Sequence, residues 1–279
     1  MKKITSNSIN QFKKYLILEE KSNLTVEKYV RDITKFMNWC YDKDITKEVV
    51  LEYKQMLIKN YLPASVNSIL SSINAFFAFK HRHDLKVKAL KIQKQIFTPQ
   101  NRELNKSEYY KLLEIAQSKK NQKLYYLIQT ICSTGIRISE LKYITVEAVK
   151  NEKINIKSKG KIRLVFIPKR LCKILNKYIS QNKIKSGPVF ISRNGNPLDR
   201  SNVWKALKNL CKNTNLSQEK IFPHNLRHLF AKTYYSAQKD IVRLADILGH
   251  SNINTTRIYT MESGDIHYKQ IQKLGLLRF

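Results

Sequence analysis

Glycine and proline are scarce in this chain. Only seven Gly and six Pro occur among its 279 residues, whereas disordered segments and sandwiches of many short strands use more of both. Long disordered stretches and a sandwich fold are therefore not expected. Hydrophobic residues still make up 42% of the chain, which is enough to fill real cores. The length suits one large domain or two of ordinary size.

Paired cysteines and long apolar runs are absent. The four cysteines stand tens of residues apart and beside apolar residues, at Cys40, Cys132, Cys172 and Cys211. Without a CxxC pair they predict buried free thiols and suit a reducing cytoplasm. No run of about 18 apolar residues occurs, and the N-terminal residues lack the apolar centre of a signal peptide. We therefore expect a cytoplasmic protein without a membrane span, associated with the nucleoid when it binds DNA.

Acidic residues are also few for so basic a chain. Lys and Arg number 52 against 21 Asp and Glu, which gives a net charge of +31. Self-repulsion of this size is rare in a globular protein without a polyanionic partner. Nucleic acid is the first expectation, with an affinity that falls steeply as salt rises. A membrane surface or an acidic protein is the alternative, and a low-GC genome that encodes Lys freely also inflates the charge.

Helical spacing dominates the first ninety residues. A helix is expected near 8–20, Thr25 is a candidate N-cap for a second, Thr46 opens a third, and Pro63 stands where a fourth begins. After each start, apolar residues recur every three or four positions. This pattern predicts a small four-helix unit.

The domain organisation follows from a change in composition after this unit. We predict a helical N-terminal domain over 1–88, a basic linker over 89–103 that contains Pro99, and a second domain with a C-terminal tail over 104–279. The second domain opens with the capping-box spacing of Asn105 and Glu108.

Strand signals are brief in the second domain. Residues 153–157 and 163–167 flank the turn Ser158-Lys159-Gly160-Lys161, which predicts an antiparallel hairpin, and 189–191 is a candidate third strand. Helical patterns fill most of the remainder, at 122–133, 169–182, 200–213, 224–236 and 239–248. The expected fold class is mainly α, with a helical N-terminal domain and a mostly α second domain that carries a small β-hairpin.

Three motifs follow one another in the second domain. They read TGIRISEL at 134–141, HNLRH at 224–228 and LGHSNINTTRIYT at 248–260. In this order they resemble the tyrosine recombinases, also called the phage-integrase family, in their simple Xer-like form. The resemblance covers roughly 105–270, and the helical N-terminal unit looks less specifically like the family's core-binding domain. One such motif alone is too short to identify a family. The three motifs in this order, together with a lysine in the hairpin, are specific.

The basic residues of these motifs suit chemistry on a phosphodiester. Attack on the phosphate builds negative charge, which fixed cationic donors must meet. Arg137 and Arg227 match this need because a guanidinium binds two oxygens and keeps its proton. His224 lies three residues before Arg227, on the same helix face, and can exchange a proton or donate to phosphate. The alternative is that each is one more basic residue of an already basic chain.

The resemblance assigns the nucleophile to Tyr259. It stands nine residues after His250, a position where the family carries a His or Trp that contacts the phosphate. A phenol needs alignment and neighbouring cations to become a good nucleophile. A buried core tyrosine is the alternative, since the chain has fifteen, and the nearby rivals are Tyr234, Tyr235 and Tyr268.

Three further residues complete the expected site. By resemblance Lys159 is the general acid that protonates the leaving 5′ oxygen, although Ser158 replaces the family's usual Gly and other lysines flank it. Glu140 is expected to orient a cation, and His228 to support the site. A metal site on His224 and His228 is not expected, because the HExxH glutamate and a third ligand cluster are missing.

The resemblance implies a covalent cycle that requires neither a cofactor, a metal nor ATP. Tyr259 forms a 3′-phosphotyrosyl link and frees a 5′-hydroxyl, which then attacks a partner strand. The implied partners are double-stranded DNA recombination sites. The protein is expected to be a monomer when free in solution and to form a homotetramer on paired DNA sites. The apolar tail at 261–279 docks on a neighbouring protomer or on its own domain. We also expect no additional arm-binding domain before residue 1.

Three other functions compete with this hypothesis. A DNA-binding protein without catalysis would form no covalent product. A relaxing enzyme like type IB topoisomerases would act as a monomer without paired sites. A metal nuclease would need a carboxylate cluster that the sequence does not show. Within the recombinase hypothesis, element integration or excision, dimer resolution and DNA inversion stay open.

Overall fold

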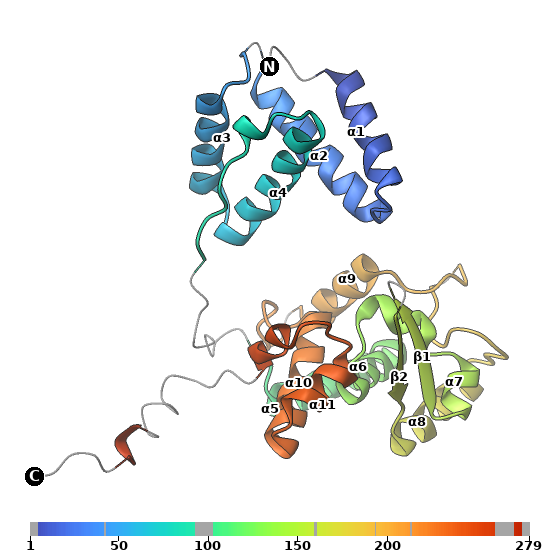
Figure 1. Cartoon of the computed structure of the whole chain (residues 1–279). Coiled ribbons are helices and arrows are strands. Elements are labelled where there is room, and N and C mark those ends of the chain that lie inside the picture. Colours follow the sequence, from blue (N-terminus) through green and yellow to red (C-terminus); the bar gives the residue numbers. More distant parts are fainter. Residues whose placement is uncertain are drawn as a thin grey trace, which may run out of the picture. The chain divides into compact units, whose positions relative to one another are not determined.

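The chain folds into two compact units, Met1–Lys94 and Gln95–Phe279 (Figure 1). The computed structural model describes residues 5–41, 43–92, 103–158, 161–192, 194–212, 214–259 and 271–274. Most of these residues are helical, and the only strands among them form one antiparallel pair. The mainly α fold class with a small hairpin is therefore confirmed.

Four helices build the N-terminal unit. They are α1 (Ser6–Leu18), α2 (Asn23–Trp39), α3 (Lys47–Asn60) and α4 (Pro63–Phe79), and a short 3-10 helix follows at His83–Leu85. Thr46 caps α3 and Pro63 opens α4, as predicted. The predicted cap of α2 is wrong. Ser22 is the N-cap, and its side chain accepts the Thr25 N–H at 3.4 Å. Thr25 is thus the capped position in the first turn, not the cap.

Aromatic side chains fill the core of the N-terminal unit. Phe12, Phe36, Phe76 and Phe77 are fully buried, and the Phe12 and Phe76 rings meet edge to face at 5.2 Å. Such pairs favour this geometry because ring edges are positive and ring faces negative. The core thereby joins α1, α2 and α4, and α2 contacts both of the other helices more extensively than they contact each other.

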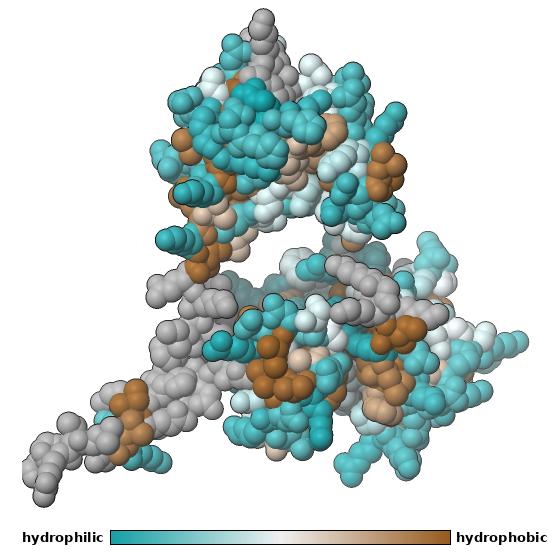
Figure 2. Space-filling view, in the orientation of Figure 1, coloured by the Kyte–Doolittle hydropathy of each residue, from teal (hydrophilic) through white to brown (hydrophobic). Residues whose placement is uncertain are grey.

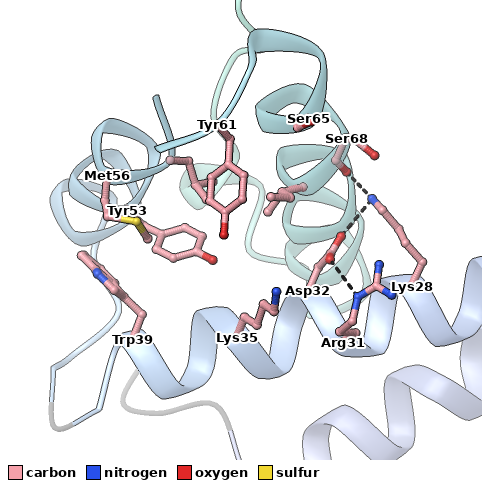
Figure 3. A pocket seen from close by; sticks show the side chains of 12 residues that line it. Lys28, Arg31, Asp32, Lys35, Trp39, Tyr53, Met56, Tyr61, Ser65 and Ser68 are labelled. Carbon is pink, nitrogen blue, oxygen red and sulfur yellow. Dashed lines mark hydrogen bonds and ion pairs between the residues drawn. The ribbon is translucent and has the colours of Figure 1, made fainter. Parts of the chain in front are cut away.

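A groove of about 710 Å³ lies between α2, α3 and α4 (Figure 3). One wall carries the basic side chains of Lys28, Arg31 and Lys35 from α2. Asp32, at its floor, is buried and pairs with Lys28 Nζ at 2.9 Å. Ser72 of α4 donates to the same carboxylate at 2.8 Å. This network adds polar contacts to the apolar core between α2 and α4.

Seven helices and the hairpin build the described part of the C-terminal unit. The helices are α5 (Lys106–Ser118), α6 (Gln122–Thr134), α7 (Val146–Lys150), α8 (Lys169–Gln181), α9 (Arg200–Leu210), α10 (Pro223–Gln238) and α11 (Ile241–Leu248). Strands β1 (Lys153–Ser158) and β2 (Lys161–Phe166) pair with Ile156 opposite Arg163. The predicted capping box of Asn105 and Glu108 is present.

The predicted third strand at 189–191 is wrong. This segment makes only isolated bridges, in which Thr145 pairs with Pro188 and Ile191 with Pro197. Proline has no N–H to donate to a ladder, so neither bridge extends into a strand. The local apolar run that suggested a strand instead places Val189 and Phe190 in the core.

The surface of both units is largely hydrophilic on the visible face, with separate apolar spots (Figure 2). Three of the exposed apolar residues alternate along β2, at Ile162, Leu164 and Phe166. Cys40, Cys172 and Cys211 are buried and Cys132 is partly buried, and all four are free thiols, as predicted. None of the described helices combines the length and apolar character that a membrane crossing requires.

Candidate active site

The first arginine of the site follows a tightly packed helix end. Helix α6 ends at Gly135, which has a left-handed φ of +65°, and a Cβ there would lie 2.4 Å from the Phe230 ring of α10. Glycine therefore lets the chain turn while α6 packs against α10. Arg137 lies two residues further on and is the N-cap of the 3-10 helix Ile138–Tyr143.

Glu140 joins two arginines. Its Oε2 accepts the backbone N–H of Arg137 at 2.7 Å, and its Oε1 accepts Nη1 of the same residue at 3.0 Å. Oε2 also accepts Nη2 of Arg163, which enters from β2, at 2.7 Å. The Glu140 side chain is 6% exposed, so its charge is buried and needs these donors.

Arg227 lies at the bottom of the same cluster. It is fully buried, and its guanidinium donates from Nη1 to Gly135 O at 2.6 Å and from Nη2 to Leu248 O at 2.7 Å. Burial, together with Arg137, lowers the pKa of Arg227 to about 10. It still keeps its proton at neutral pH.

The cluster holds more positive than negative charge. Arg137, Arg163 and Arg227 converge on one carboxylate, Glu140, and on backbone carbonyls at the end of α11. The Arg137 side chain is 39% exposed, against 13% for Arg163. The surplus charge therefore reaches solvent through Arg137, and it suits an anion such as a phosphate.

His250 follows the helix C-cap Gly249 and faces Arg227. Arg227 Nη2 lies 3.1 Å from His250 Nε2, and His250 Nδ1 lies 2.9 Å from Thr256 Oγ1. Because an arginine only donates, Nε2 must accept and Nδ1 carries the proton donated to Thr256. Burial and the nearby arginines lower the pKa of His250 to about 4. The imidazole is therefore neutral at neutral pH.

The other two histidines lie on α10 with Arg227. His224 is in the first turn, which begins with Pro223 as predicted, and burial and Arg227 lower its pKa. Burial also lowers the pKa of His228, against the opposing effect of Glu103. His228 Nδ1 lies 4.0 Å from Glu103 Oε1.

Tyr259 packs between His228 and His250. Its ring lies edge-on to His228 at 4.7 Å and stacks on His250 at 6.0 Å, between ring centroids. The residue is 3% exposed and shares a small apolar cluster with Leu244 and Leu248 of α11. The structure thus brings the predicted nucleophile beside two of the predicted histidines.

Some of the predicted site residues fall outside the part of the chain that the structure describes. Lys159 at the hairpin tip and most of the tail at 261–279 lie outside the described residues. The rival tyrosines Tyr234 and Tyr235 are partly buried beside the Tyr259 cluster, while Tyr268 is outside the described residues. Within the part of the chain that the structure describes, no three His, Cys, Asp or Glu side chains form a group suited to a metal ion.

Sequence reasoning missed three contributors to the site. They are Arg163, Thr256 and Glu103, which lie against Glu140, His250 and His228 respectively. A signal for Arg163 was available, because it lies on the same face of β2 as the buried Val165. A charged residue on an inward strand face requires a partner. Nothing local marks the other two.

Two family descriptions match this chain. The Phage integrase family matches residues 102–264, and the Phage integrase N-terminal SAM-like domain matches residues 9–84. Tyrosine recombinase XerA of Pyrococcus horikoshii is 28% identical over 284 residues, covering 98% of this chain and 95% of the relative. Tyrosine recombinase XerD of Vibrio cholerae is 27% identical and covers 85% of each chain.

Solved structures share the fold. The crystal structure of XerA recombinase covers 99% of this chain and all of that chain, with 24% identity and a TM-score of 0.52. The XerH site-specific recombinase in a pre-cleavage complex with its difH substrate covers 90% of this chain and 80% of that chain, with 22% identity and a TM-score of 0.68. With the matches over both units, this chain belongs to the phage integrase family of tyrosine recombinases, enzymes that break and rejoin DNA.

Proposed function

We propose that this chain is a site-specific recombinase whose Tyr259 attacks a DNA phosphate and forms a 3′-phosphotyrosyl intermediate. The observation that carries the proposal is the convergence of cationic and proton-carrying groups around one tyrosine. Arg137 and Arg227 lie in one hydrogen-bonded cluster with His250, and the His250 ring stacks on Tyr259. Xer relatives of similar length also support it.

The arginines meet the charge that builds on the phosphate. Arg137 presents a partly exposed guanidinium, and the buried Arg227 adds a second fixed positive charge behind it. Both are held by carbonyl or carboxylate acceptors before substrate arrives, so little reorganisation is needed during reaction. The surplus of positive charge also favours binding of DNA over neutral ligands.

The bond changes balance without a cofactor, a metal or ATP. The Tyr259 Oη–P bond forms as the P–O5′ bond breaks, and the bond energy stays in the phosphotyrosyl link. In this cycle His224 of the HNLRH motif takes the phenol proton, a role carried over from the family resemblance; burial and Arg227 lower its pKa, so its imidazole is in the neutral form that this role requires. Lys159 gives a proton to the leaving 5′ oxygen. The reverse steps, with a 5′-hydroxyl from a partner strand, rejoin the DNA.

Tyr259 must become accessible for this chemistry. Only 3% of the residue is exposed, so its phenol cannot meet an external phosphate in this arrangement. We therefore include in the cycle a rearrangement of the segment from His250 to Tyr259 upon DNA binding. Four protomers on two duplex sites would then exchange strands.

Covalent adduct formation tests the proposal. A random-sequence library of nicked duplexes is incubated with the protein without divalent metal, and SDS-resistant adducts are captured and sequenced. Wild type should capture a defined pair of inverted half-sites, and Tyr259→Phe should capture nothing. Tyr234→Phe, from the same apolar cluster, is the matched control and should form adducts.

The outcomes separate the competing functions. If the wild-type protein forms no adduct, the result favours the competing function of a DNA-binding protein without catalysis. Adducts that persist in Tyr259→Phe would reject this nucleophile. Adducts without sequence preference, together with relaxation of supercoiled plasmid by a monomer, would favour the topoisomerase-like function.

A further inference from the structure

Arg163 lies at the centre of the arginine cluster, although the proposed cycle gives it no role. Its Nη1 donates to Leu248 O at 2.7 Å, and its Nη2 donates to Glu140 Oε2 at 2.7 Å. Arg163 belongs to β2, Leu248 ends α11, and Glu140 belongs to the 3-10 helix after α6. One planar guanidinium therefore joins three segments that are distant in sequence.

Each acceptor of Arg163 is shared with one of the two proposed phosphate-binding arginines. Leu248 O also accepts Arg227 Nη2, at 2.7 Å. Glu140 Oε2 also accepts the backbone N–H of Arg137, at 2.7 Å, while Oε1 accepts its Nη1. Movement of the Arg163 guanidinium would shift both acceptors, and with them the spacing between Arg137 and Arg227.

Fold stability alone does not account for an arginine at this place. Arg163 Nε is buried without a hydrogen-bond partner among the described residues. Burial, opposed by Glu140 and reinforced by Arg137, lowers the pKa of Arg163. An incompletely satisfied buried cation beside like charges contributes less to stability than a well-packed apolar side chain would.

The turn after α11 leaves space for this side chain. A Cβ on Gly249 would lie 2.4 Å from Arg163 Nη1 and 2.6 Å from its Cδ. The backbone between Leu248 and His250 thus approaches the guanidinium as closely as glycine permits. The close fit fixes the direction of the fork.

We propose that Arg163 is a positioning residue for DNA cleavage, which sets the spacing of Arg137 and Arg227 through Glu140 and the Leu248 carbonyl. The inference rests on the proposed function, because it takes Arg137 and Arg227 as the phosphate ligands. A lysine would keep the charge but has no planar fork to hold two acceptors on separate segments. If only the charge of Arg163 matters, Arg163→Lys should keep full activity. If the fork geometry matters, Arg163→Lys should lose activity as Arg163→Gln does.

Single-turnover adduct formation on nicked cognate DNA tests the inference, with DNA affinity measured separately. Arg163→Gln and Arg163→Lys should each slow adduct formation about 100-fold, the loss expected from a displacement of about 1 Å in a catalytic group. The dissociation constant for DNA should stay unchanged. Arg170→Gln, an exposed arginine at the start of α8, is the matched control and should react at the wild-type rate.

A double-mutant cycle shows whether Arg163 acts through Arg137. In an Arg137→Lys background, Arg163→Gln should add little further loss, because residues of one unit are not additive. Thermal melting checks folding, and Arg163→Lys carries the test if Arg163→Gln does not fold. Wild-type rates in Arg163→Gln, full activity in Arg163→Lys, or independent losses in the double variant would each overturn the inference.

Failure of the proposed function gives a different result. Adducts that persist in Tyr259→Phe would reject the proposed nucleophile, while the Arg163 variants could still be ranked by their adduct rates and decide the inference. Absence of any wild-type adduct would reject the proposed function and the Arg163 inference together.

Discussion

Arg227 donates a hydrogen bond from Nη2 to Nε2 of His250 across 3.1 Å. This contact requires a neutral His250, because a protonated imidazole has no acceptor nitrogen. Protonation would place two cations face to face in a buried cluster. The contact therefore links the charge state of one histidine to the geometry of a proposed phosphate ligand.

Acidification should destabilise the C-terminal unit. The pKa of His250 falls from 6.5 to about 4 in the folded chain, so the unfolded chain binds more protons between these values. Stability that is complete above pH 6.5 is then lost progressively as the pH falls toward 4. His224 and His228 act in the same direction, because their pKa values are also lowered. Thermal melting between pH 7 and pH 4 measures the effect.

His250→Gln should make this pH dependence shallower. The glutamine has no proton to gain in this range, so its folded and unfolded states no longer differ there. His83→Gln changes an exposed histidine of the N-terminal unit and is the matched control. Equal slopes for wild type and His250→Gln would contradict the prediction.

Glu140→Gln should destabilise the C-terminal unit by about 3 kcal/mol, because it removes the only carboxylate that Arg137 and Arg163 contact among the described residues. An amide accepts on one atom only and would turn an N–H group toward one of the two arginines. Urea denaturation measures the change. Glu114→Gln, at an exposed position of α5, should change the free energy of unfolding by less than about 0.5 kcal/mol.

Gly249→Ala should cost more stability than Gly195→Ala. Both glycines have positive φ, +64° and +75°, so a Cβ strains the backbone of each by about 1 kcal/mol. A Cβ at Gly195 meets nothing within 4 Å, whereas at Gly249 it lies 2.4 Å from Arg163 Nη1. The difference between the two variants in thermal melting isolates the crowding of Arg163. Equal losses would show that the arginine moves aside freely.

Asp32→Ala should destabilise the N-terminal unit by about 2 kcal/mol, since it leaves Lys28 and Ser72 without their buried carboxylate. Replacing Lys28 by Met and Asp32 by Leu together should recover much of this loss, because neither charge then remains buried. Asp44→Ala, at an exposed position, is the control. Urea denaturation of the full chain measures the free energy of unfolding. A double variant less stable than Asp32→Ala would contradict the prediction.

Local patterns predicted most of the secondary structure. The starts of α3, α4 and α5 depend on a cap, a proline and a capping box within one helical turn, and all three were right. The third strand failed because of two flanking prolines: Pro188, just before the segment, bridges Thr145, and Pro197 lies opposite Ile191. No property of 189–191 itself reveals what lies opposite.

The motifs likewise predicted the family, which the matches over both units confirm. Arg163 escaped notice because its importance lies in contacts with Glu140 and Leu248, 23 and 85 residues away in sequence. Its place on the inward face of β2, with Val165, showed that it needs a partner, but not which residues supply one.

The amino-acid sequence by itself determined the helices, the hairpin and the family, because caps, periodicity and motifs are local features. Only the tertiary structure decided that Arg227 lies on the carbonyl of Gly135, 92 residues away, and that Tyr259 is buried between His228 and His250. Packing of α6, α10 and α11 makes those contacts, and burial then lowers the pKa values of Arg227, His228 and His250.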